Sequence, residues 1–230
     1  MAETIEAFLY RVTAPVGGQF LRPWMTRWPR PENARVFTVG CNPRNPYPTD
    51  KVSHQEHVEA LLNRNGRRCG DLYERLTGEP SRTRENIDAF VDTLAQHDIH
   101  DVIQTNAVCY ATKDSKCLKY PEHAEGLLAG RKAFHEVLHY IRPHVVIIFG
   151  SNTISHLRAG TTGPLKRVEI CRIKQPHEPC EQSFVLGPWT LAVISIRSLG
   201  LPGFNHWRKW SAAHLERVAE RVVSLLRPAV

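Results

Sequence analysis

The chain has 230 residues, of which 42% are hydrophobic and 23% charged, and this composition is typical of a globular protein with room for one α/β domain. No stretch approaches the length of a membrane span, and Met1-Ala2-Glu3-Thr4 lacks the basic and apolar regions of a secretory signal, so we expect a cytoplasmic protein, bacterial in character, with no membrane partner. The formal net charge of +7 favours a polyanionic partner.

The first third of the chain combines helices with one informative strand. Residues 2–12 can form a short helix, and a loop rich in Pro, Trp and Arg follows at 21–31. The apolar run from Arg35 to Val39 predicts a buried strand of a parallel sheet and ends in Gly40-Cys41-Asn42-Pro43. Glycine permits close approach of a ligand, and proline cannot continue the ladder of hydrogen bonds. Asn42 therefore lies where open α/β sheets bind ligands, unless this is an ordinary turn from strand to loop.

Helices follow this strand. Ser53 could cap one, with Glu56 three residues later as in a capping box. Residues 72–76 and 83–94 read as further helices, and apolar residues recur at helical spacing from Leu127 to Ile141, just before Pro143. A final helix with the same spacing ends before Pro228.

Three more apolar runs predict strands, at 101–106, 144–151 and 191–198, and the span 168–186 reads as a β excursion. Helices between strands indicate a parallel sheet, so we expect a single domain, 1–230, folded as a three-layer α/β/α sandwich around about four parallel strands. Right-handed crossovers bring the carboxyl ends of such strands to one rim. The residues expected at that rim are Asn42, Asn106, Ser151, Arg197 and Ser198.

The six cysteines are scattered, and no pair has the two-residue spacing of zinc or iron–sulfur sites. They are most simply free thiols in a cytosolic chain. Cys171, His177 and Cys180 remain an alternative metal site, but we expect neither metal nor cofactor.

Gly40-Cys41-Asn42-Pro43 resembles the first motif of the uracil-DNA glycosylase superfamily, a Gly-x-Asp/Asn-Pro loop after the first core strand. Thr105-Asn106 resembles the strand end that presents a base-reading asparagine, and Val146 to Ser151 resembles the third core strand with its turn. Ser195 to Leu201 stands where the superfamily carries its second motif, usually His-Pro-Ser. The resemblance implies an enzyme that excises a base from DNA.

The chain also departs from this pattern. His-Pro-Ser is absent, so Arg197 or His206 would have to support the leaving base. The iron–sulfur cysteines of one thermophilic branch are missing too. Arg44 stands where classical uracil enzymes place a tyrosine that blocks C5 substituents and other branches place a glycine.

The resemblance assigns two asparagines to the chemistry. The Asn42 carbonyl would hold a water molecule under C1′, which is catalysis by positioning. The amide of Asn106, with one acceptor and a donor pair, would read uracil in one orientation and cytosine in the other, unless it only caps the turn after its strand. Backbone N–H groups near Cys41 and the Arg197 cation would stabilise the departing base.

Two residues bear on the substrate. The Arg44 guanidinium would admit a C5 group and donate hydrogen bonds to it, or it would contact a phosphate. In this respect the chain resembles glycosylases of the superfamily that attack hypermodified phage DNA. This suggests a modified pyrimidine such as hydroxymethylated or glucosylated cytosine. Tyr47 would stack on the flipped base or pack within its loop.

The loop after the last predicted strand, 200–210, would bind DNA. Leu201, Pro202 or Phe204 could be the apolar wedge that unstacks bases, and Arg208 and Lys209 would meet phosphates. Trp207 and Trp210 are expected to anchor the final helix. Further DNA contacts are predicted at Ser151, Ser198, His206 and the loop 112–116.

The sequence therefore predicts a monomeric, monofunctional DNA glycosylase of a modified pyrimidine, because no lysine stands at a predicted strand end to act as nucleophile. A noncatalytic nucleic-acid or nucleotide-binding protein on the same scaffold is the main alternative. A nucleoside hydrolase is a third, and fold alone does not separate them.

Overall fold

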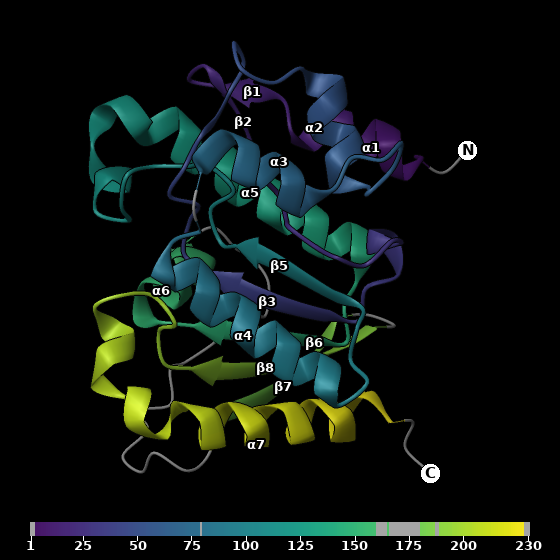
Figure 1. The fold of residues 1–230 in the computed structure, drawn as a ribbon, viewed down its shortest axis with the longest axis vertical. Coiled ribbons are helices and arrows are strands. Elements are labelled where there is room, and N and C mark those ends of the chain that lie inside the picture. Colours follow the sequence, from purple (N-terminus) through teal and green to yellow (C-terminus); the bar gives the residue numbers. More distant parts are fainter. Residues whose placement is uncertain (1–2, 79, 160–164, 166–179, 187–188, 228–230) are drawn as a thin grey trace.

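The structure is a computed structural model that describes residues 3–78, 80–159, 165, 180–186 and 189–227 (Figure 1). Its centre is a five-stranded sheet in the order β5-β3-β6-β8-β7. The first four strands are parallel to one another, and β7 runs antiparallel to β8. Their bounds are β5 (Val102–Asn106), β3 (Val36–Gly40), β6 (Val145–Phe149), β8 (Trp189–Ile196) and β7 (Cys180–Leu186).

The four parallel strands confirm the predicted sheet. All residues of β3 and β6 are buried, which is why β6 is a continuous apolar run and β3 is interrupted by a polar residue only at Thr38. The β7 strand lies in the predicted excursion 168–186, of which residues 168–179 are outside the described residues. The carboxyl ends of the parallel strands meet at one edge of the sheet, on the left in Figure 1.

Helices cover both faces of the sheet, as the predicted three-layer sandwich requires. On one face, α4 (Arg82–Gln96) and α7 (Arg208–Leu226) pack against one apolar cluster. On the other face lie α1 (Ile5–Val12), α2 (His54–Leu61), α5 (Ala124–Ile141) and α6 (Ser151–Ala159). The short α3 (Cys69–Thr77) joins α2 to α4.

The helix ends follow local sequence signals. The Ser53 hydroxyl accepts a hydrogen bond from the Glu56 N–H at 3.1 Å, so the predicted cap of α2 is confirmed. The α5 helix ends at Arg142, which has a left-handed conformation (φ 57°) before Pro143. The predicted helix at 83–94 begins one residue earlier, at Arg82, because Ser81 caps it, and it ends at Gln96.

A second, three-stranded antiparallel sheet lies beside the first. It consists of β1 (Pro15–Val16), β2 (Gln19–Phe20) and β4 (Tyr47–Pro48). The chain after Asn42 therefore returns to pair with β2. Short 3-10 helices occupy Pro31–Asn33, Cys117–Lys119, Pro121–His123 and Gly203–His206. Within the described part of the chain, no helix combines the length and apolar character needed to cross a membrane.

Candidate functional site

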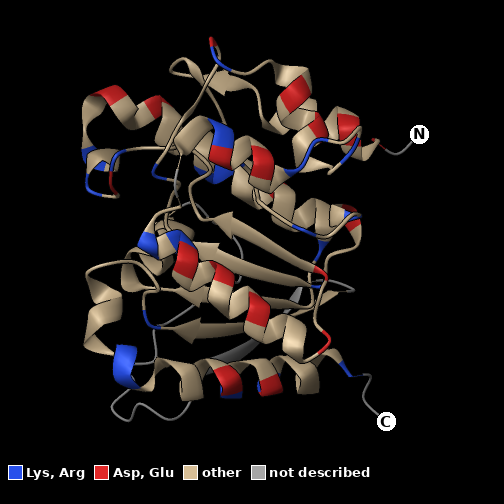
Figure 2. Ribbon diagram, viewed as in Figure 1, with Lys and Arg blue, Asp and Glu red and all other residues tan. Residues whose placement is uncertain are grey.

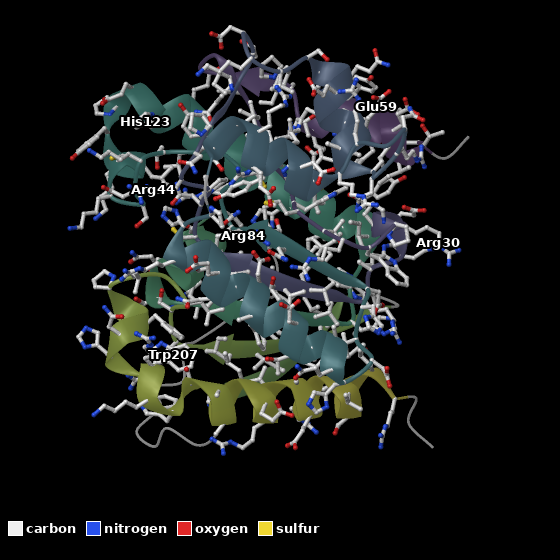
Figure 3. The ribbon with its side chains drawn as sticks, viewed as in Figure 1. Arg30, Arg44, Glu59, Arg84, His123 and Trp207 are labelled. Carbon is white, nitrogen blue, oxygen red and sulfur yellow. The ribbon has the colours of Figure 1, made fainter. Side chains whose placement is uncertain are left out.

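A cleft of about 690 Å³ lies at the carboxyl ends of β3, β5 and β6. Its other walls are the loop 112–116, the start of α6 and the loop 198–203. Figure 3 shows Arg44 on this side of the molecule and Arg30 on the opposite side. The predicted site residues that line the cleft are Gly40, Cys41, Asn42, Arg44, Asn106, Ser151, Ser198 and Leu201.

An inner pocket of about 170 Å³ adjoins the cleft between the ends of β3 and β5 and the start of α4. Both cavities are lined by Asn42, Arg44 and Asn106, together with Thr83, Ile87 and Phe149. The two asparagines, 64 positions apart in the sequence (106 − 42), thus lie on the same pair of connected cavities.

The side chain of Asn42 is held in one orientation. Its Nδ2 donates to the Pro43 carbonyl at 3.0 Å and to the Thr112 Oγ1 at 2.8 Å. The Thr112 hydroxyl donates its own proton to the Asp114 carbonyl at 2.7 Å, so toward Asn42 it acts as an acceptor. Since the amide nitrogen is engaged twice and no described residue donates to the Asn42 Oδ1, that oxygen is available to accept a hydrogen bond at the cleft.

Asn106 owes its position to Gly40, its partner in the register of β3 and β5. A Cβ added to Gly40 would lie 2.8 Å from the Asn106 Oδ1 and 3.2 Å from the Phe149 ring. Any residue other than glycine would therefore displace the amide. No described residue hydrogen-bonds the side chain of Asn106, which leaves its donors and its acceptor for a ligand.

The Cys41 thiol lies between these two strand ends, and burial raises its pKa to about 11. A thiol with that pKa is protonated near neutral pH and is a poor nucleophile. The site therefore favours attack by water over covalent catalysis by this cysteine.

The loop 112–116 brings both signs of charge to the cleft. Lys113 and Lys116 are exposed there, next to Asp114. The Asp114 carboxylate accepts the backbone N–H groups of Lys116 and Cys117 at 2.8 and 3.2 Å, which lowers its pKa. It fixes the loop, and the two lysine side chains remain on the surface.

Arg197 does not lie where its predicted role requires. Its side chain is exposed, its guanidinium lies 5.4 Å from the centre of the Trp210 ring, and it is not among the residues that line the cleft. Successive residues of an extended chain point to opposite sides, so only the next residue, Ser198, faces the cleft. This placement contradicts support of the leaving base by Arg197. His206 is exposed and also outside the cleft lining.

Tyr47 is a second correction. It is only 3% exposed and packs with Phe20, Val52, Ala60 and Leu72. The pairing of β4 with β2 sets Tyr47 opposite Phe20 and turns its ring into this cluster. Tyr47 lines neither the cleft nor the inner pocket, so packing, and not base stacking, accounts for it.

The loop 200–210 divides into a cleft part and a core part. Leu201 is 41% exposed at the cleft, as a wedge would be. Phe204 is half-buried against Trp207, with ring centres 5.3 Å apart, and does not line the cleft. Trp207 is buried and donates to the Ser198 carbonyl at 2.9 Å, which confirms its predicted anchoring. Arg208 and Lys209 are exposed at the start of α7, outside the cleft lining.

Sequence reasoning missed several residues of these cavities. Thr38 and Gln104 are buried polar residues inside apolar strands, two positions before Gly40 and Asn106, and that spacing was a usable signal. Arg22, in the Pro- and Trp-rich loop, carried no such signal. Thr112 belongs to the loop 112–116, which was predicted to contact DNA, but its hydrogen bond to Asn42 was not predicted. All but Thr112 line the inner pocket, and Thr112 lines the cleft.

No cluster of metal-ligating side chains occurs among the described residues. Cys171 and His177 of the alternative metal site lie outside them, and the side chain of Cys180 is not described. Comparison with protein-family models and with curated proteins found no match for this chain. The resemblance to the uracil-DNA glycosylase superfamily therefore stays a prediction from its motifs.

Proposed function

We propose that this protein is a DNA glycosylase that hydrolyses the N-glycosidic bond of a modified pyrimidine, uracil or a C5-modified cytosine, and leaves an abasic site. The observation that carries the proposal is the meeting of Asn42 and Asn106 at one cleft, with the amide of Asn42 held by Thr112 and the amide of Asn106 unengaged by any described residue.

In the proposed reaction, Asn42 positions the nucleophile. Its Oδ1 accepts a hydrogen bond from a water molecule and holds it beneath C1′. An amide is too weak a base to take the proton, so its contribution is proximity and orientation. The C1′–N1 bond breaks toward an oxocarbenium-like sugar, the bonding electrons leave with the base, and the water oxygen bonds to C1′. The proton that the water gives up passes to solvent in the cleft, and the base anion takes up a proton from solvent as it departs.

The departing base carries negative charge, which the pocket is suited to stabilise. Three arginines, Arg22, Arg44 and Arg84, line the inner pocket, and no acidic side chain of the described chain does. One well-placed donor at a developing anion commonly contributes about 3 kcal/mol. These arginines would stabilise the departing base in place of Arg197, whose guanidinium lies against the Trp210 ring.

Binding of DNA at this edge agrees with the charge pattern. Lys113 and Lys116 are exposed and border the cleft. Figure 2 shows side chains of both signs along α4 and α7, with three acidic and two basic residues on α4 and two acidic and four basic ones on α7. Extrusion of a nucleotide costs a few kcal/mol, and an inserted apolar side chain at Leu201 would offset it by filling the gap in the stack.

The decisive experiment is detection of free base. The protein is incubated with oligonucleotides that contain uracil, cytosine, 5-hydroxymethylcytosine or its glucosylated form, and the released base is identified by mass spectrometry. Asn42→Ala should retain DNA binding and lose base release by about 100-fold or more, because the attacking water is no longer held. Borohydride should trap no covalent adduct, as expected for a monofunctional enzyme.

Asn33→Ala is the matched control, because Asn33 is exposed in the 3-10 helix Pro31–Asn33, away from the cleft lining. Equal rates for wild type and Asn42→Ala would overturn the role of Asn42.

One observation favours a noncatalytic nucleic-acid-binding protein instead. The His-Pro-Ser motif is absent, and the cation at the corresponding place lies on Trp210, outside the cleft. DNA binding without release of any base from these oligonucleotides would support this alternative.

A further inference from the structure

Three polar atoms lie unpaired at the inner pocket. The Arg22 Nη1, Thr38 Oγ1 and Gln104 Oε1 are buried and have no hydrogen-bond partner among the described residues. Their residues are only 8%, 0% and 8% exposed, and all three line the pocket. Buried polar groups are nearly always paired, so three orphans at one small cavity indicate that a ligand supplies the partners.

The backbone holds these groups in a defined place. Thr38 and Gln104 are register partners on β3 and β5, two residues before Gly40 and Asn106. Because residues two apart share a face of a sheet, they lie on the same face as Gly40 and Asn106 and one step deeper. The Gln104 Nε2 lies 3.5 Å from the Asp88 Oδ1, which turns the Oε1 of the same amide away from that carboxylate.

Arg22 enters the pocket from the neighbouring loop. Its backbone N–H donates to the Cys109 carbonyl at 2.8 Å, and its guanidinium lies 4.8 Å from the Tyr47 ring centre and 5.6 Å from that of Tyr73. Both aromatic faces stabilise the cation, and the Tyr47 hydroxyl also interacts with the guanidinium, so Nη1 is the donor without a partner among the described residues. By contrast, Arg84 is engaged by Asp88 at 2.7 Å. Arg22 is therefore the buried cation with a donor left for a ligand.

The depth of these groups decides which part of a base they would meet. In the proposed reaction the glycosidic nitrogen lies near Asn42 at the cleft. In a pyrimidine the ring atom farthest from that nitrogen is C4, with its exocyclic group, and its ring neighbours are N3 and C5. Because Asn106 is assigned to the N3 side of the base, the deeper groups would meet the C5 side. A cavity of about 150 Å³ can hold one benzene molecule, so a volume of about 170 Å³ is on the scale of one substituted pyrimidine ring.

We infer that Arg22, Thr38 and Gln104 form a specificity subsite for a C5 substituent that both donates and accepts hydrogen bonds, of which a hydroxyl group is the simplest. A hydroxyl accepts from Arg22 and donates to Gln104, whereas an anionic group would leave the Gln104 oxygen without a donor. A methyl group or hydrogen at C5 offers none of the three polar atoms a hydrogen bond. This inference rests on the proposed function.

The test compares substrates that differ by one oxygen atom. Single-turnover release is measured from oligonucleotides with 5-hydroxymethylcytosine against 5-methylcytosine, and with 5-hydroxymethyluracil against thymine. Wild-type protein should release at least one hydroxymethylated base about 100-fold faster than its methyl analogue, because a site built to bond a hydroxyl rejects the analogue that lacks it.

Thr38→Val and Arg22→Met remove the polar atoms and keep most of the side-chain volume. Thr38→Val should lower release of the hydroxymethylated base and leave release of the methylated base unchanged or faster, so that the preference falls to a few-fold. Arg22→Met should slow release of both bases, because Arg22 also stabilises the departing base in the proposed reaction, and it should slow release of the hydroxymethylated base more. Thr38→Val is nearly isosteric and suits a strand, so it keeps the test decisive if Arg22→Met does not fold. Arg27→Met is the control, because Arg27 pairs with Asp92 on the surface.

Failure of the inference and failure of the proposed function give different results. Two results would overturn the subsite but not the proposed glycosylase activity. One is equal rates of base release from the matched substrates, and the other is an equal decrease of both rates in Thr38→Val. If no base is released, calorimetric binding of 5-hydroxymethyldeoxycytidine and 5-methyldeoxycytidine decides. If the wild-type protein binds 5-hydroxymethyldeoxycytidine more tightly and Thr38→Val loses this preference, the subsite exists in a binding protein. If the wild-type protein binds both nucleosides equally, the subsite is refuted.

Discussion

At the residue scale, the site depends on how neighbours aim two amides. Thr112 accepts from the Asn42 Nδ2 because its own proton is committed to the Asp114 carbonyl. Gly40 leaves the space that the Asn106 amide occupies. Thr112 and Gly40 are positioning residues, because each acts through an asparagine and need not touch the substrate. Substituting them changes the orientation of that asparagine while the asparagine itself is retained.

Thr112→Val should lower the single-turnover rate of base release about 10-fold, because the Asn42 amide loses the acceptor that fixes its orientation and the water is held less well. DNA affinity should stay the same, since Asn42 itself is retained. Thr93→Val is the matched control, because Thr93 bonds only its own helix, at the Ala89 carbonyl. A rate equal to wild type would show that Thr112 does not orient Asn42.

Gly40→Ala should impair base release while changing the free energy of unfolding by less than about 1 kcal/mol. The added Cβ lies 2.8 Å from the Asn106 Oδ1, and a flexible side-chain end can move aside at little cost in stability but not in base reading. Urea denaturation and release assays measure the two effects. Gly70→Ala is the control, because nothing lies within 4 Å of its Cβ. Full activity in Gly40→Ala would argue against base reading by Asn106.

At the scale of elements, the strands deliver polar residues to one rim and the helices hold the strands in place. The Ser53 cap of α2 lies outside the cleft lining. Its removal tests whether this helix supports the fold without taking part in the site. Helix caps contribute to stability because they satisfy N–H groups that have no partner within the helix.

Ser53→Ala should lower the free energy of unfolding by about 1 kcal/mol, as the Glu56 N–H loses its acceptor. Base release by the folded protein should not change. Ser224→Ala, on the exposed surface of α7, should stay within about 0.5 kcal/mol of wild type in the same urea titration. A loss of activity in folded Ser53→Ala would mean that α2 takes part in the site.

The strands also show which elements local sequence patterns can predict and which they cannot. The runs 35–39, 101–106, 144–151 and 191–198 predicted the parallel strands because a strand buried on both faces is apolar throughout. The same patterns placed Asn42 and Asn106 at one rim. They did not predict the return of 47–48 to pair with β2, because a two-residue strand has no periodicity of its own. The error at Tyr47 follows from that pairing.

At the scale of the whole molecule, charges of both signs lie on the outer helices, and two lysines border the cleft (Figure 2). The α4 helix carries three acidic and two basic residues, and α7 carries two acidic and four basic ones. A phosphate backbone would be attracted to Lys113 and Lys116 at the rim where the strands end.

The double substitution Lys113→Ala and Lys116→Ala should reduce the salt dependence of DNA binding. Each lost phosphate contact on duplex DNA lowers the slope of log K against log salt by about 0.9, so the expected change is up to about 1.8. Fluorescence anisotropy at several salt concentrations measures it. Lys132→Ala on α5, whose side chain is 80% exposed, is the control. An unchanged slope in the double variant would show that this loop does not meet phosphates.

By itself, the sequence determined the α/β/α class, the order of the main strands and helices, and the meeting of strand ends at one rim, because apolar periodicity, caps and prolines act within a few residues. The tertiary structure alone decided which side chains face the cavities. Thr112 is 70 residues from the amide it orients, Arg197 lies on Trp210, and Arg22 joins Thr38 and Gln104 from another loop. Such contacts arise when distant segments pack against one another, and local sequence carries no record of that packing.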